Sequence, residues 1–170
     1  MRLPPFLYLA PKSVREALAM IAGEGPQASF VAGGTDLYPN MKRRHQTPKT
    51  LVALRRLREL RGVRRLPDGG LRIGPMATLT SLEGEAPIRR DRPALFDAIR
   101  SISTPILRNM GTIGGNLLLD TRCNYYDQSY EWRRAIHFCM KCEGETCWVA
   151  PGSDRCLAVQ SSDSAPILCA

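Results

Sequence analysis

The residues with the most distinctive chemistry in this 170-residue chain are its six cysteines, five of which lie between residues 121 and 160. Four of them are spaced by 16, 8 and 9 residues: Cys123, Cys139, Cys147 and Cys156. Four thiolates suit either a zinc ion or an iron–sulfur cluster. Cys139 and Cys142 form a C-x-x-C pair, which favours zinc, but a four-cysteine zinc site usually has two such pairs. Spacing alone therefore leaves both metals open.

Two glycine pairs, Gly33-Gly34 and Gly114-Gly115, each follow an apolar segment. Glycine lets the backbone approach a ligand closely and adopt positive φ, so that successive N–H groups can point at one anion. Neither stretch matches a Rossmann or Walker fingerprint. Each pair alone also fits an ordinary turn, whereas two such turns after apolar runs favour a shared phosphate cradle.

Short regular elements must position these groups. Apolar runs predict strands over residues 6–9, 28–32 and 50–54 and a hairpin over 63–73. A capping box of Ser13 and Glu16 predicts a helix that ends at Gly23–Gly25, and Thr80 with Glu83 predicts a second helix start. A third helix has Pro93 in its first turn and ends at Thr104-Pro105. The last apolar stretch predicts a helix after Ser162, so we expect the domain to continue beyond residue 170.

Residues 121–160 show no clear helical or strand period, yet they contain six of the eleven aromatic residues. We interpret the segment as an insert, and its aromatic side chains first as a miniature core that also keeps water from a bound metal.

Composition narrows the class of protein. The chain is 44% hydrophobic and 24% charged, with a formal net charge of +8. It has no apolar run of the roughly 20 residues that a membrane span needs and no apolar stretch near its start typical of a secretory signal, so we expect a cytoplasmic protein without membrane attachment.

Residues 40–66 contain ten Lys or Arg and one Glu, which indicates either a solvated surface or an acidic partner. A nucleic-acid partner is disfavoured because residues 40–66 contain no Phe, Tyr or Trp to stack on bases. His45 is the one ring among these cations.

The segments Val31–Leu37 and Arg108–Asn116 together resemble the FAD-binding subunit of the molybdenum hydroxylases, the xanthine dehydrogenase and carbon monoxide dehydrogenase family. The resemblance implies an α+β, two-subdomain PCMH-type FAD-binding fold that is incomplete at its C-terminus. Subdomain 1 would span residues 1–56, and subdomain 2 would span residues 57–170 with the insert at 121–160. The cofactor residues that it implies are Phe30, Val31, Ala32, Gly33, Gly34, Thr35, Asp36, Leu37, Ile102, Thr112, Ile113, Gly114, Gly115, Asn116 and Asp163.

The sequence around Cys123 and Cys156 is similar to the β subunit of 4-hydroxybenzoyl-CoA reductases, a branch of that family with a 4Fe–4S cluster in its insert. This resemblance implies that Cys123, Cys139, Cys147 and Cys156 are cluster ligands and that Cys142 is not. It also implies a large subunit with molybdenum cofactor, a small subunit with 2Fe–2S clusters, and ferredoxin as electron donor for dehydroxylation of 4-hydroxybenzoyl-CoA in anaerobic aromatic degradation. The alternatives are an FAD subunit of another molybdenum hydroxylase and, more remotely, a nucleic-acid-binding module with zinc.

Overall fold

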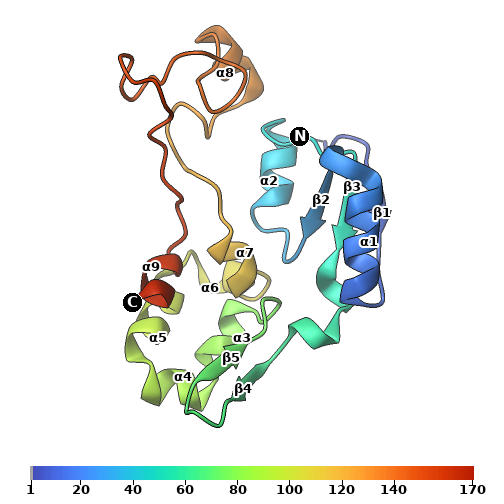
Figure 1. Ribbon diagram of the computed structural model, residues 1–170, viewed down its shortest axis with the longest axis vertical. Helices are drawn as coiled ribbons and strands as arrows, with labels where there is room; N and C mark the ends of the chain where they lie inside the picture. Colours follow the sequence, from blue (N-terminus) through green and yellow to red (C-terminus); the bar gives the residue numbers. More distant parts are fainter. Residues whose placement is uncertain (1) are drawn as a thin grey trace.

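A parallel three-stranded sheet organises the first lobe of the computed structural model, which describes residues 2–170 (Figure 1). Its strands are β1 (Leu7–Leu9), β2 (Ala28–Val31) and β3 (Thr50–Ala53), in the order β1-β3-β2. All four residues of the central strand β3 are buried. The three predicted strands are thus confirmed, and each differs from its predicted range by one residue at one end.

Helix α1 (Val14–Glu24) covers this sheet and begins where the capping box predicts. The Ser13 hydroxyl accepts from the Glu16 amide at 3.1 Å, and the helix ends at Gly25, whose φ of 71° suits glycine. The sequence did not predict the short helix α2 (Leu37–Lys42) that follows the first glycine pair. Leu57 and Leu60 also pack with this lobe's core, so the chain leaves the lobe slightly beyond the expected boundary at residue 56.

The second lobe combines a hairpin with short helices. Strands β4 (Val63–Arg65) and β5 (Leu71–Ile73) pair antiparallel, as predicted. The helices of this lobe are α3 (Leu79–Glu83), α4 (Ala86–Asp91), α5 (Pro93–Ser101), α6 (Pro105–Arg108), α7 (Ile113–Leu117) and α9 (Ala165–Cys169). Apolar residues from α3, α4 and α5 form its core with Ile113. Helix α9 contacts α5, so the chain returns to this lobe after the insert.

Two capping predictions in this lobe were wrong. Thr78, rather than Thr80, caps α3 and accepts from the Ser81 amide, because the helix begins two residues earlier than the Thr80–Glu83 pattern indicates. Thr104-Pro105 does not end α5, which stops at Ser101; instead Thr104 caps α6 and Pro105 occupies its first turn. Thr and Pro suit a helix start as well as a chain break, and sequence alone did not distinguish them.

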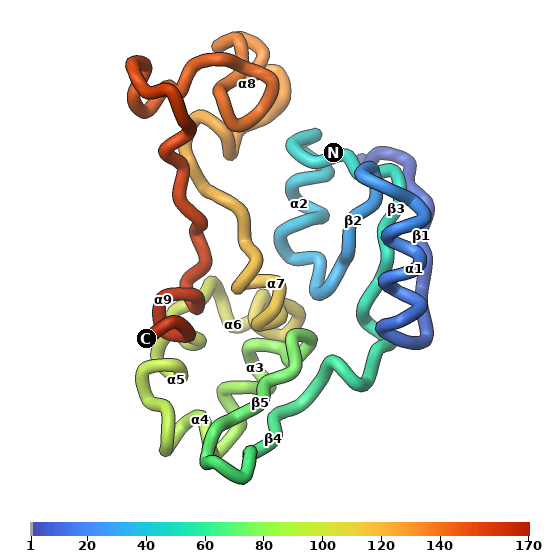
Figure 2. The backbone as a smooth tube through the Cα atoms, viewed as in Figure 1, coloured from blue at the N-terminus to red at the C-terminus, as the bar shows by residue number. Residues whose placement is uncertain are grey.

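The insert leaves the second lobe on one extended arm and returns on another (Figures 1 and 2). Its distal part carries a short helix, α8 (Tyr130–Ala135), and lies near the α2 end of the first lobe. The Arg122 amide donates to the Ser161 hydroxyl at 2.9 Å, and the Gln160 side chain donates to the Leu117 carbonyl, so the two arms are joined near their base.

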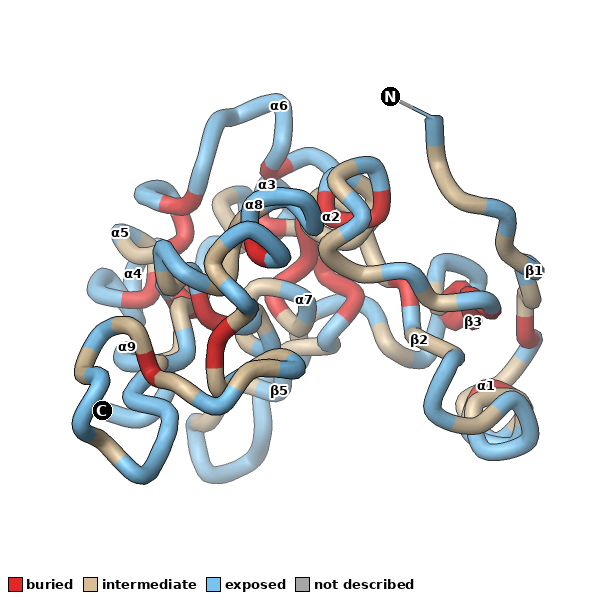
Figure 3. The backbone as a smooth tube through the Cα atoms, turned by 90° about the horizontal axis from the view of Figure 1, so that it is seen from above, coloured by how far each residue is buried: buried red, intermediate tan, exposed pale blue. Residues whose placement is uncertain are grey.

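Burial differs between these parts (Figure 3). Both lobes contain buried aliphatic clusters, whereas none of the six aromatic residues of the insert is buried. The interpretation of these rings as a miniature core was therefore wrong. Within residues 2–170, no helix combines the length and apolar character that crossing a membrane requires.

Candidate functional site

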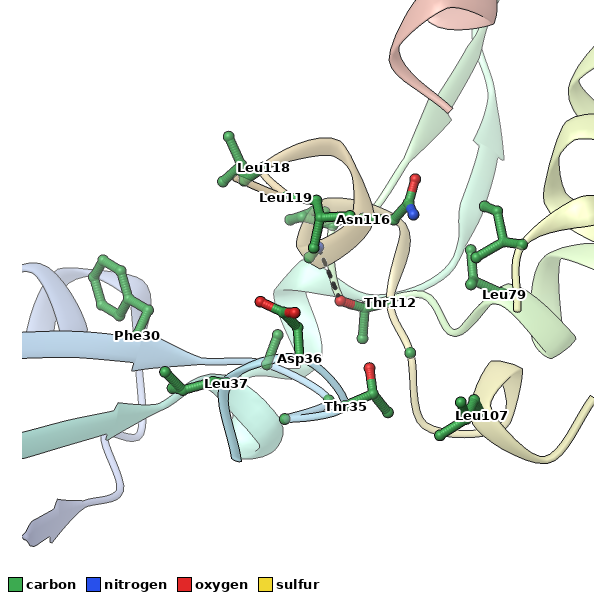
Figure 4. A pocket seen from close by; sticks show the side chains of 18 of the residues that line it. Phe30, Thr35, Asp36, Leu37, Leu79, Leu107, Thr112, Asn116, Leu118 and Leu119 are labelled. Atoms are coloured by element: carbon green, nitrogen blue, oxygen red, sulfur yellow. Dashed lines mark hydrogen bonds between the residues drawn. The ribbon is translucent and has the colours of Figure 1, made fainter. Parts of the chain in front are cut away.

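A cleft of about 630 Å³ lies between the two lobes and is lined by both glycine loops (Figure 4). Thr35 and Asp36 of the first loop face Thr112 of the second. The volume falls within the range of pockets that hold small ligands and cofactors. Most of the predicted cofactor residues line it: Phe30, Ala32, Gly33, Gly34, Thr35, Asp36, Leu37, Ile102, Thr112, Gly114, Gly115, Asn116 and Asp163.

Two predicted cofactor residues, Val31 and Ile113, do not line the cleft. Val31 is buried in the core of the first lobe, and Ile113 is buried in the core of the second. Each lies beside a glycine loop in the sequence, but its apolar side chain anchors the loop to the lobe behind it. The side chains of Val31 and Ile113 are thus core positions, and a contact between FAD and the backbone of either residue stays a prediction.

Backbone donors are distributed unequally between the two loops. The amides of Ile113, Gly114 and Gly115 donate to the Ala77 carbonyl, the Pro75 carbonyl and the Thr112 hydroxyl, respectively. By contrast, the described part of the chain offers no hydrogen-bond acceptor to the amides of residues 33–36. The first loop therefore has the donors that a phosphate group needs, and a pyrophosphate contact by the second loop stays a prediction.

Glycine is required where the loops approach each other. A Cβ on Gly33 would lie 1.9 Å from the Met110 carbonyl oxygen, and one on Gly114 would lie 2.6 Å from the Pro75 Cβ. Gly34 has a φ of 75°, which L side chains rarely adopt. Gly33 therefore allows the two loops to approach each other across the cleft, whereas Gly34 and Gly114 allow each loop to pack against its own lobe.

Asn116 has a structural role in addition to the cofactor contact that the resemblance implies, and that contact stays a prediction. Its side-chain oxygen accepts from the Ser164 hydroxyl at 2.7 Å and amide at 3.1 Å, and its side-chain nitrogen donates to Asp163 at 3.0 Å. Asn116 thereby fixes the returning arm against the second glycine loop, which explains why Asp163, distant in sequence, lines the same cleft.

Sequence reasoning missed about half of the cleft lining. The missed residues are Ser29, Gln46, Leu54, Pro75, Met76, Leu79, Ser103, Leu107, Gly111, Leu118, Leu119, Asp120 and Arg122. The charged residues Asp120 and Arg122, at the start of the expected insert, were a visible signal.

A second, much smaller cavity lies in the insert and is lined by four cysteines: Cys123, Cys139, Cys147 and Cys156. Its volume is about 10 Å³, the space of roughly one water molecule. In residues 2–170, no three Cys, His, Asp or Glu side chains converge as they would around a single metal ion. The donor set suits a cluster, and binding one would require these four side chains to rearrange around it.

Cys142 does not line this cavity. Its sulfur accepts a hydrogen bond at 3.1 Å from Arg133, a guanidinium that is only 3% exposed. The C-x-x-C pair therefore directs its two sulfurs into different surroundings, which differs from a knuckle that closes on one zinc ion.

Cys147 lies among backbone donors. The amides of Leu157 and Ala150, and more weakly that of Val149, lower the pKa of its thiol from the ordinary value, although burial opposes them. Thiolates are the forms that bind metals, so these donors favour the ligating state of Cys147. Nearby, His137, Phe138 and Glu143 all have positive φ, which costs backbone energy in the loop that carries Cys139.

The basic run at 40–66 is divided among elements of both lobes. Arg43 pairs with Asp127 of the insert at 2.7 Å, and Arg65 pairs with Asp91 of α4. Several of these cations thus have contacts within the molecule, and the run does not form the interleaved basic and aromatic surface that single-stranded nucleic acid prefers.

Comparison with known proteins agrees with this geometry. Residues 4–170 match the family model described as the FAD binding domain in molybdopterin dehydrogenase. The chain belongs to this family, and it contains an FAD-binding domain of the molybdenum hydroxylase type.

The individual relatives differ in how much of this chain they match. The carbon monoxide dehydrogenase medium chain of Hydrogenophaga pseudoflava is 40% identical over 114 residues, which cover 67% of this chain and 39% of the relative. The aldehyde oxidoreductase FAD-binding subunit PaoB of Escherichia coli K12 is 35% identical over 165 residues, which cover 94% of this chain and 51% of the relative. The second match therefore includes the insert. The chain spans about two fifths to one half of the length of these relatives.

Solved structures give the same fold. A Cu,Mo-CO dehydrogenase structure matches with a TM-score of 0.65 and 38% identity over 69% of this chain and 41% of the other. Quinoline 2-oxidoreductase from Pseudomonas putida 86 matches with a TM-score of 0.67 and 32% identity over 71% and 42%.

Proposed function

We propose that this chain is an electron-transfer subunit of a molybdenum enzyme, with FAD in the cleft between the lobes and a 4Fe–4S cluster on the insert. The observation that supports the 4Fe–4S cluster is that Cys123, Cys139, Cys147 and Cys156 line one cavity, whereas Cys142 does not. FAD exchanges one or two electrons and iron–sulfur clusters exchange one, so the two groups together can join one-electron and two-electron partners.

The residues of this chain bind and orient rather than catalyse substrate chemistry. The free amides of the first glycine loop bind phosphate oxygens, and the four thiolates hold iron. The cleft lining offers no arrangement of nucleophile and general base, so conversion of an organic substrate belongs to a partner. We propose a large subunit with molybdenum cofactor and a small subunit with 2Fe–2S clusters as these partners, with ferredoxin as the external donor.

The substrate follows from the partner rather than from this chain. Dehydroxylation of 4-hydroxybenzoyl-CoA stays our specific hypothesis, and another molybdenum hydroxylase reaction is the alternative. The match to an aldehyde oxidoreductase subunit spans the insert, so possession of the insert does not by itself select hydroxybenzoyl-CoA. Among other molybdenum hydroxylase reactions, this match therefore favours oxidation of an aldehyde.

Two measurements test the proposal. Protein purified without oxygen should show flavin and iron–sulfur absorption and contain iron and acid-labile sulfide; stoichiometric zinc without sulfide would refute the cluster. The complex with its co-encoded subunits should then be assayed with 4-hydroxybenzoyl-CoA plus reduced ferredoxin and with aromatic aldehydes plus an electron acceptor. Turnover of the aldehydes alone would refute the hydroxybenzoyl-CoA assignment and leave the electron-transfer role intact.

A further inference from the structure

This inference rests on our proposal that FAD binds in the cleft between the lobes, whose lining is acidic for a site that binds a pyrophosphate. Three carboxylates line it: Asp36, Asp120 and Asp163. Arg122 is the one cationic side chain among its lining residues in the described chain, and it comes from the base of the insert rather than from either lobe. A dianionic pyrophosphate bound by the amides of residues 33–36 would lie beside the Asp36 carboxylate, which repels it unless a cation intervenes.

Arg122 makes direct contact with that carboxylate. Its terminal nitrogen pairs with one oxygen of Asp36, and the other Asp36 oxygen accepts from Asn40 at 3.1 Å. Arg122 also lies 3.5 Å from Asp127, which pairs with Arg43 at 2.7 Å. Arg43 in turn donates to Asn40 at 2.6 Å, so these five side chains close a ring between α2 and the insert.

Asp120 receives its countercharge from the insert as well. The Lys141 ammonium lies 3.2 Å from this carboxylate, and Lys141 also lines the cysteine cavity. Burial opposes ionisation of Asp120, but the Thr121 amide and Lys141 outweigh burial and lower its pKa. Asp163, by contrast, has only the neutral amide of Asn116 as its partner. The insert therefore supplies the cations for two of the three acidic groups in the cleft.

We propose that the cysteine-rich insert completes the FAD site, with Arg122 as a binding residue that neutralises Asp36 beside the pyrophosphate and Lys141 as a positioning residue that holds Asp120. Arginine suits this role because its guanidinium has five N–H donors in a fixed plane and remains charged. Asp36 and Asp127 use the two terminal nitrogens, which leaves further N–H groups of Arg122 for a phosphate oxygen. The insert thus contributes to flavin affinity in addition to carrying the cysteines.

A double-mutant cycle tests the inference on purified protein stripped of flavin and titrated with FAD. Arg122→Ala should weaken FAD binding roughly tenfold, because the pyrophosphate would then lie beside the unneutralised Asp36 carboxylate. Solvent screens the partly exposed Arg122–Asp36 pair, which keeps the loss from being larger. Asp36→Asn in the Arg122→Ala background should restore most of the affinity, since the repelling charge is then gone. Arg122→Lys should retain most of it, and Arg134→Ala, which removes an exposed cation of the insert away from the cleft, should leave it unchanged.

Other outcomes would overturn the inference. Wild-type affinity in Arg122→Ala, or no recovery in the double variant, would show that Arg122 does not act by neutralising Asp36. An equal loss of FAD in Cys147→Ser, which leaves Arg122 intact, would show that the insert acts only through its folding. Failure of the wild-type protein to bind FAD would instead count against the cofactor assignment itself, so the two failures are distinguishable. Added salt should weaken wild-type binding more than Arg122→Ala binding; equal salt dependence would also contradict the proposal.

Discussion

The two lobes and the insert are stabilised by different chemistry. Each lobe encloses clusters of buried aliphatic residues, such as Leu51 and Met41 in the first and Leu82 and Ile99 in the second. The buried residues between 121 and 160 are instead one threonine, one arginine and two cysteines: Thr121, Arg133, Cys139 and Cys147. Apolar burial accounts for the lobes, whereas the insert depends on ion pairs, hydrogen bonds and, we propose, a bound cluster.

This difference predicts where a substitution acts. A change that separates the lobes should abolish the flavin site, and a change at a cysteine should remove metal and leave the lobes folded. Substitutions at the junctions between lobes and insert should have intermediate effects, because there the two kinds of stabilisation meet.

The largest effect is expected from Gly33→Ala. The added Cβ would lie 1.9 Å from the Met110 carbonyl oxygen, so the two glycine loops must move apart. We expect FAD binding to fall by more than about a hundredfold and the free energy of unfolding to fall by about 2–3 kcal/mol, typical of severe overpacking. Titration with FAD and denaturant unfolding measure the two effects.

Gly23→Ala is the matched control for this substitution. Nothing lies within 4 Å of its added Cβ, and it sits within α1, so it should stabilise the protein by up to about 1 kcal/mol without changing FAD affinity. Unaltered FAD binding in Gly33→Ala would show that the cleft between the loops is not the flavin site.

The next effect separates the insert from the lobes. Cys147→Ser should remove most of the iron and loosen the distal part of the insert, because serine is a harder and weaker ligand for iron. Flavin content should persist, since the FAD loops and Arg122 belong to the lobes and to the hydrogen-bonded base of the insert. Cys142→Ser should retain iron because its sulfur faces Arg133 rather than the cavity. Iron and sulfide assays after anaerobic reconstitution distinguish these variants, and the reverse pattern would exchange the assigned roles of Cys142 and Cys147.

The periodic parts of the molecule could be predicted from sequence. The strands at 28–31 and 50–53, the hairpin, and the capped helix after Ser13 follow from apolar spacing and local capping, because those signals are contained within a few residues. The helices of four to six residues were mostly missed, since one turn of helix gives too few positions to show a period. Thr78 and Thr104 illustrate the limit, because Thr80 offers as good a cap as Thr78 and because Thr104-Pro105 fits a helix start as well as a helix end.

In the candidate site, too, the residues with local signals could be predicted and those that depend on distant partners could not. Glycine loops and cysteines were recognisable because their residue types are chemically distinctive. Arg122 and Asp120 were missed as cleft residues because their role depends on Asp36, 86 residues away from Arg122, and on Lys141. The side chains of Val31 and Ile113 face the cores rather than the cleft, because neighbouring positions in a loop can face opposite directions.

Asn116→Ala tests the junction between the second glycine loop and the returning arm, with an intermediate effect. Loss of its side chain leaves the completely buried Ser164 without its main acceptor and frees Asp163. We expect a loss of about 2–3 kcal/mol in the free energy of unfolding, the cost of stranding buried polar groups. Denaturant unfolding measures it, with exposed Asn124→Ala as the control. Equal stability of both variants would show that the arm is held by other contacts.

The smallest effect concerns the contact between the insert and the first lobe, and it depends on pH. Burial, followed by the nearby Asp120 carboxylate, raises the pKa of Tyr126 to about 12, and its ring packs edge-on against His45 with centroids 4.5 Å apart. Because the folded protein holds this proton more tightly than the unfolded chain, whose tyrosines titrate near 10, the stabilisation is complete below about pH 10 and is lost as the pH rises toward 12. Tyr126→Phe should therefore reduce stability slightly at pH 8, by about 1 kcal/mol or less since the side chain is partly exposed, and should flatten the decline between pH 10 and 12. Urea unfolding across this range measures both effects, and Tyr130→Phe, an exposed ring of the same insert, should keep the wild-type slope. An unchanged slope in Tyr126→Phe would show that the insert does not use this phenol to hold its place beside the lobe.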